Sequence, residues 1–179
     1  MKKIYDNDIQ WEGSINKADK EYKFQSELTA KLDKHEGDFT ETTLLEIVLW
    51  KTNRYPEINS DLLQSINELR REYSKAKAIT VLKTLLGLRG FDLPMASTVL
   101  RFACPEHLQI IDQRVYRFIT EGTDTLDKPH NIDKKVGMYF DYLDRLRTVC
   151  QAYKIPFCKA DRILYQLDKE LNKEYPIRY

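Results

Sequence analysis

The feature that most constrains the fold of this chain is a short turn between two apolar segments, at residues 85–97. The sequence there is L-L-G-L-R-G-F-D-L-P-M-A-S. Gly90 can adopt the positive φ that a sharp reversal requires, Asp92 can cap the next helix, and Pro94 is tolerated in its first turn. The pattern predicts two short helices joined by a hairpin, with backbone N–H groups beside a helix N-terminus that suit an anion.

Helical periodicity extends over most of the chain. Apolar residues recur at three- and four-residue spacing, and no alternating run is long enough for a strand. Thr43 and Glu46 have capping-box spacing near the start of one helix. The predicted helices cover about 24–32, 44–54, 62–73, 76–86, 93–103, 113–118, 133–153 and 157–173. The sequence therefore predicts an all-α protein.

Asp112 is an isolated carboxylate at the start of a predicted helix, and it follows the apolar residues Leu108, Ile110 and Ile111. The structural interpretation is an ordinary N-cap. The functional interpretation is a carboxylate on an apolar wall, where an unpaired charge is costly. Such an arrangement suits a group that must face a developing cation. The spacing by itself is compatible with both.

Together the hairpin and Asp112 resemble the helix-hairpin-helix DNA glycosylases, the superfamily that includes endonuclease III and the adenine glycosylases. That family combines an L-P-G-V-G-x-K-T-A hairpin, an apolar helix and a V-D-T-H-V motif or a close variant. Residues 88–96, 97–102 and 111–115 correspond to these three parts. The resemblance covers about residues 40–120.

The resemblance implies a two-lobed helical bundle with a cleft between the lobes. The length suits one compact domain, 1–179. Within it, the resemblance implies a hairpin-bearing lobe over 40–120 and a second lobe formed by 1–39 and 121–179. The implied partner is double-stranded DNA.

The implied reaction is hydrolysis of the N-glycosidic bond of a flipped damaged or modified base. Positive charge grows on the sugar as the base departs, and Asp112 would stabilise it and orient the attacking water. Pro94 stands where bifunctional members carry a Schiff-base lysine, which implies a monofunctional enzyme. Asp92 replaces the second hairpin glycine and puts a negative charge near the expected phosphate. The sequence does not identify the excised base, and both DNA repair and phage defence are compatible roles.

A second group of candidate residues lies at the end of the predicted 44–54 helix. The resemblance makes it a base-pocket candidate: Trp50 can stack, Lys51 and Arg54 can contact phosphate or base, and Asn53 both donates and accepts hydrogen bonds. The alternative is that Trp50 belongs to the core and that the helix dipole favours the cations.

Further candidates for DNA contact lie in or after the hairpin. These are Arg89, Gly90, Phe91, Arg101 and Arg114. Arg89 is in the turn itself and is the best phosphate candidate, whereas scattered cations are also typical of a solvated surface.

Asp161 and Tyr165 share a helix face at i,i+4 spacing. They are base-pocket candidates if that face lines the cleft. A surface Asp161 beside Arg162 is the alternative.

The composition limits the remaining choices. A net charge of +1 provides no global basic field, so local patches must bind any nucleic acid. Cys104, Cys150 and Cys158 suit reduced thiols; they cannot supply the four-cysteine iron–sulfur cluster of several relatives, and with His130 they are too sparse for zinc. We expect no metal or other cofactor, no membrane span, a cytoplasmic location and a monomer.

These observations favour a monofunctional DNA glycosylase with Asp112 as its catalytic carboxylate. The alternative is a non-catalytic helix-hairpin-helix DNA-binding module, which Asp92 and the near-neutral charge support. A nuclease is less favoured because no acidic cluster or histidine pair suits two-metal chemistry.

Overall fold

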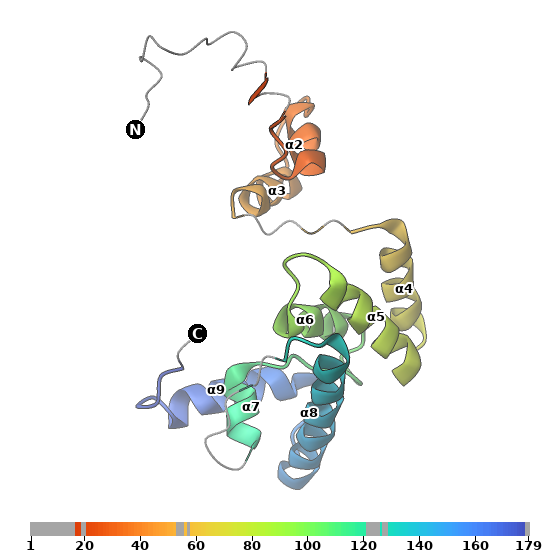
Figure 1. The fold of residues 1–179 in the computed structure, drawn as a ribbon. Helices are drawn as coiled ribbons and strands as arrows, with labels where there is room; N and C mark the ends of the chain where they lie inside the picture. Colours follow the sequence, from red (N-terminus) through yellow and green to blue (C-terminus); the bar gives the residue numbers. More distant parts are fainter. Residues whose placement is uncertain are drawn as a thin grey trace. The chain divides into compact units, whose positions relative to one another are not determined.

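The computed structural model describes residues 17–18, 21–52, 56, 58–120, 126 and 129–177. Within these ranges it contains eight α-helices and one 3₁₀ helix, with no strand (Figure 1). The all-α prediction is therefore confirmed. Among the described helices, none is both long enough and apolar enough to cross a membrane.

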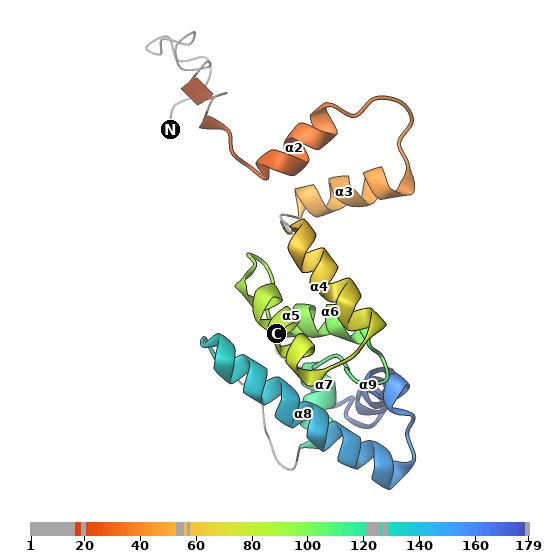
Figure 2. The ribbon, with the colours of Figure 1, turned by 90° about the vertical axis from the view of Figure 1, so that its right-hand side faces the viewer.

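The larger of two compact units, Pro56–Tyr179, is organised around α5 (Lys75–Gly87). This helix contacts α4 (Ser60–Arg71), α6 (Leu93–Ala103) and the long α8 (Ile132–Tyr153) (Figure 2). It can do so because its buried residues form a broad apolar stripe. They are Ala78, Val81, Leu82, Leu85 and Leu86.

Two further helices complete this unit. α7 (Gln113–Ile119) contacts both α8 and α9 (Ala160–Leu171), and the 3₁₀ helix η1 (Phe157–Lys159) precedes α9. A single hydrophobic cluster extends along the chain from Leu62 to Leu164. The segment between α6 and α7 is thus anchored by one continuous core.

Polar N-caps begin most helices of this unit and fix where they start. The side chain of each cap residue accepts a hydrogen bond from a backbone N–H in the first turn of its helix. The cap residues are Asn59, Ser74, Asp92, Asp112 and Asn131. Asp92 and Asp112 were predicted as caps, and α6 has the predicted limits, so these predictions are confirmed. The φ of +85° at Gly90 confirms the predicted reversal.

The smaller unit, Met1–Tyr55, contains α2 (Ser26–Asp33) packed against α3 (Glu41–Lys51). At the start of α3, Thr40 and Thr43 cap each other reciprocally. The predicted capping box of Thr43 and Glu46 is wrong, because the helix begins one turn earlier.

The observed units differ from the predicted lobes. Residues after 120 share a core with α4 to α6, because α8 buries its apolar face against α5 and α9 packs on α7. In contrast, α3 lies with α2 in the smaller unit. The cleft between lobes remains a prediction.

Candidate active site

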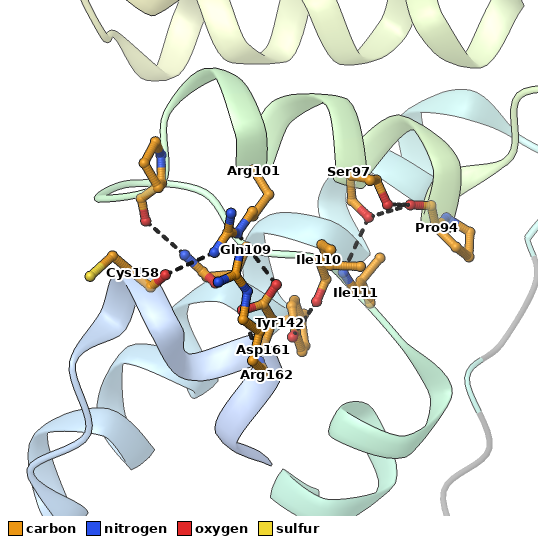
Figure 3. Close-up of polar contacts among 12 residues, drawn as sticks. Pro94, Ser97, Arg101, Gln109, Ile110, Ile111, Tyr142, Cys158, Asp161 and Arg162 are labelled. Atoms are coloured by element: carbon orange, nitrogen blue, oxygen red, sulfur yellow. Dashed lines mark hydrogen bonds and ion pairs between the residues drawn. The ribbon is translucent and has the colours of Figure 1, made fainter. Parts of the chain in front are cut away.

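Asp112 stands at the end of a non-helical segment, residues 108–112, that we call the strap. Buried side chains bind its backbone from two helices (Figure 3). The hydroxyl of Tyr139 donates to the carbonyl of Gln109 at 2.9 Å, and that of Tyr142 donates to the carbonyl of Ile110 at 2.7 Å. On the α6 side, the N–H of Ile111 donates to Ser97 Oγ at 3.2 Å. Because buried backbone groups need such partners, these bonds hold the strap in one conformation.

Burial keeps the two tyrosines in their neutral, donating form. It raises the pKa of Tyr139 and of Tyr142 well above their usual value. The negative charges of Asp161 and Asp112 raise the pKa of Tyr142 further. The hydrogen bonds to the strap therefore persist across the neutral pH range.

The Asp112 carboxylate is half-buried and caps α7. Its Oδ1 accepts the N–H of Arg114 at 2.8 Å, so the N-cap interpretation is confirmed. Leu108 and Ile111 beside it are fully buried, as the apolar-wall interpretation expects. Within the described part of the chain, no group hydrogen-bonds Oδ2. One oxygen of the carboxylate is thus held in place by the start of α7.

The hairpin is more exposed than the strap. The N–H of Phe91 donates to the carbonyl of Leu88 at 3.2 Å and closes the turn. Arg89 and Gly90 are exposed at its tip, where the sequence placed the phosphate contact, and Phe91 packs partly against the core.

The charge of Asp92 is balanced by α8. Its Oδ1 accepts the N–H of Leu93 at 2.8 Å and pairs with Lys135 Nζ at 2.7 Å. A pocket of about 250 Å³ lies beside this pair, between the hairpin and the start of α8. The sequence analysis did not anticipate Lys135, which lies on α8 far along the chain.

Arg101 and Asp161 are buried together, although both were predicted to face substrate. Their exposed fractions are 6% and 5%, and Arg101 Nε lies 3.4 Å from Asp161 Oδ2. Arg101 also donates to the carbonyl of Cys158 at 3.1 Å (Figure 3). The predicted DNA contact of Arg101 and the surface alternative for Asp161 are therefore corrected: each charge is compensated internally because a buried charge needs a partner.

The predicted link between Asp161 and Tyr165 is replaced by other contacts. Asp161 Oδ1 accepts the N–H of Arg162 at 2.8 Å. The Tyr165 ring instead lies 5.7 Å from the guanidinium carbon of Arg114. Tyr165 thus joins α9 to the helix that Asp112 caps.

Arg114 is also tied to a carboxylate that sequence reasoning missed. Asp168 is fully buried and accepts hydrogen bonds from Arg117 at 2.8 Å, Arg114 at 3.2 Å and Asn172 at 2.8 Å. Burial acts to raise the pKa of Asp168, but these hydrogen bonds outweigh it and lower the pKa. The sequence signal that could have identified Asp168 is its position four residues after Leu164, which places an acid on the apolar face of an amphipathic helix.

Trp50 has the packing role that the alternative interpretation assigned to it. Its indole N–H donates to Thr29 Oγ1 at 2.9 Å, and the Phe24 ring meets it edge-on at 5.2 Å. Lys51 is exposed at the end of α3. Asn53 and Arg54 lie outside the described residues.

The cysteines and other metal-binding side chains are dispersed. Cys104 and Cys150 are buried free thiols, whose pKa burial raises, and Cys158 is a half-buried free thiol. Among the described residues, no three His, Cys, Asp or Glu side chains gather as a metal site.

Comparison of the chain with models of known protein families, with curated proteins and with solved structures finds no match.

Proposed function

We propose that the protein is a monofunctional DNA glycosylase that hydrolyses the N-glycosidic bond of a flipped base in double-stranded DNA. The observation that carries the proposal is the Asp112 carboxylate, which the strap presents beside a buried apolar wall. Its Oδ1 is held by the Arg114 N–H, and its Oδ2 has no hydrogen-bond partner among the described residues. Such preorganisation suits a group that must stabilise charge at one fixed point.

In this reaction, departure of the base leaves positive charge on the C1′ carbon and ring oxygen of the sugar. Asp112 would stabilise that charge and orient the attacking water through Oδ2. The N–H of Arg114 would keep the carboxylate aimed throughout. The nucleotide would first leave the stack, because its C1′ carbon cannot be reached inside a duplex.

The hairpin would supply the duplex contact. Arg89 and Gly90 at its exposed tip would meet a backbone phosphate, while Lys135 offsets the negative charge of Asp92. Pro94 lies in the first turn of α6, where a lyase lysine would be needed. Tyr165 remains a proposed base-pocket residue, and Lys51, Asn53 and Arg54 remain proposed substrate contacts.

The test is a screen of the purified protein on duplexes that each carry one damaged or modified base, scored for abasic sites. We expect excision of at least one base, strand breaks only after alkali, and little covalent adduct after borohydride trapping. Asp112→Asn is the inactive control. Excision that survives this substitution would contradict the assignment of Asp112, and efficient trapping would contradict the monofunctional mechanism.

A non-catalytic DNA-binding module is the second candidate. The observation that favours it is that Asp112 already serves as the N-cap of α7, a structural role that needs no reaction. This candidate predicts duplex binding without excision of any base in the same screen.

A further inference from the structure

A second cavity lies on α9 and opens beside α7. It has a volume of about 470 Å³, and its polar lining includes Arg114, Gln166, Lys169, Glu170, Asn172 and Lys173. This cavity is separate from the hairpin, and the glycosylase resemblance assigned no role to the two lysines.

The lining is cationic in a chain that is close to neutral. Among the described lining residues, Lys169 and Lys173 face one carboxylate, Glu170, while Arg114 pairs with the buried Asp168. The whole chain carries a net charge of only +1. Glu170 itself accepts a hydrogen bond from Gln166 at 2.8 Å. Neither lysine forms an ion pair within the described residues, so both ammonium groups remain available to an external anion.

One wall of this cavity is rigid. The buried Asp168 carboxylate accepts hydrogen bonds from Arg117, Asn172 and Arg114. The Tyr165 ring lies beside the Arg114 guanidinium. Arg114 is therefore fixed at the cavity wall before any ligand arrives, which reduces the entropy lost on binding.

Arg114 also connects the cavity to the candidate active site. Its backbone N–H holds the Asp112 carboxylate, while its side chain lines the cavity. Asp112 and Arg114 are two residues apart, which is a rise of roughly 3 Å along a helix axis. A DNA strand whose sugar faces Asp112 would therefore run past this cavity.

We propose that the cavity binds a backbone phosphate of the DNA strand that carries the target nucleotide, with Lys169 and Lys173 as its main ligands. This inference rests on the proposed function, because it requires DNA at Asp112. Phosphate is the matching ligand, since Lys and Arg supply N–H donors and positive charge without reading sequence.

The test compares two double variants that each lose two exposed lysines. Lys169→Gln with Lys173→Gln should weaken binding of a fluorescent duplex about ten-fold, and the slope of log affinity against log salt should fall by about one. Lys154→Gln with Lys159→Gln, outside the cavity, is the matched control and should leave the slope unchanged. Single-turnover excision at saturating protein should be unaffected in the control variant.

A third variant should act in the opposite direction. Glu170→Gln removes the one carboxylate among the described residues of the cavity lining, so duplex affinity should rise several-fold. An unchanged or weaker affinity for this variant would contradict the proposal.

The outcomes separate this inference from the proposed function. If the wild-type protein binds and excises but the two double variants behave alike, only the phosphate cavity is overturned. If the wild-type protein binds no duplex, both fail. Thermal unfolding with inorganic phosphate is a further arm: stabilisation that depends on Lys169 and Lys173, without any change in duplex affinity, would assign the cavity to free phosphate and overturn the inference.

Discussion

Asp92 and Asp112 occupy the same local position, the N-cap of a helix, in different surroundings. The Asp92 side chain is 54% exposed and pairs with Lys135 at 2.7 Å. The Asp112 carboxylate is half-buried and, among the described residues, forms no ion pair. One aspartate is a neutralised surface cap, and the other is a held charge on an apolar wall.

The difference arises from α8, which supports both regions along one face. Lys135 contacts the hairpin, and Tyr139 and Tyr142 bind the strap. Positions i, i+4 and i+7 of a helix share a face, so one element sets both environments. A cap requires only an oxygen and a nearby N–H, whereas the chemistry available to it depends on what the neighbouring helix provides.

The sharpest way to break this comparison is to make the same substitution at both caps. Asp112→Asn should lower single-turnover excision about 100-fold or more, because it removes the charge at the sugar. Asp92→Asn should leave excision intact. Since Asn is also a good N-cap, both variants should stay folded within about 1 kcal/mol, measured by urea unfolding. Equal loss of excision in the two variants would mean that the caps do not differ in function.

The hairpin can be tested through its backbone. Gly90→Val places a β-branched residue at a φ of +85°, where a left-handed conformation costs about 1–2 kcal/mol. We expect duplex affinity to fall about ten-fold for all sequences alike, read by fluorescence anisotropy at fixed salt.

Gly137→Ala is the control for this hairpin variant. It lies within α8 with nothing within 4 Å of an added Cβ, so it should stabilise the protein by up to about 1 kcal/mol and leave binding unchanged. Wild-type binding by the Gly90 variant would remove the hairpin from the interface.

The strap can be loosened without touching Asp112. Tyr142→Phe leaves the buried carbonyl of Ile110 without its donor and should reduce the free energy of unfolding by about 1–3 kcal/mol. Excision should fall as well, because the carboxylate is held less firmly. Tyr153→Phe, at a position 75% exposed, should change neither quantity. Lost stability with full excision would show that the strap only stabilises the fold.

The smallest effect is expected at the Asp92–Lys135 pair. Lys135→Met should change stability by less than about 1 kcal/mol, because the Asp92 side chain of this pair is 54% exposed. It should weaken duplex binding a few-fold, because the charge of Asp92 is then uncompensated. Adding Asp92→Asn should restore binding, and a double-mutant cycle measures this coupling. Additive effects would show that the two charges act independently on DNA.

Local signals were sufficient for much of the fold. Gly90, Asp92 and Pro94 together predict the turn and the start of α6, because each is suited to one backbone position. The error at the start of α3 arose because Thr40 and Thr43 are both good cap residues, and spacing does not distinguish them.

The candidate site was less predictable than the fold. Arg101 was assigned to DNA by its position after the hairpin, and Asp161 to the base pocket by its i,i+4 spacing with Tyr165. Each instead lies on a buried helix face and meets the other there. Asp168 was missed because its partners Arg114 and Arg117 lie on another helix. Such pairs join elements far apart in the chain, so no local pattern connects them.

The sequence by itself determined the helical class, the hairpin and the two aspartate caps, because these depend on apolar periodicity and on single residues near in the chain. Only the tertiary structure decided which aspartate is neutralised and which cations are buried. Those outcomes depend on how α8 and α9 pack against α5 to α7, and packing brings together charges and hydroxyl groups that the chain separates by dozens of residues.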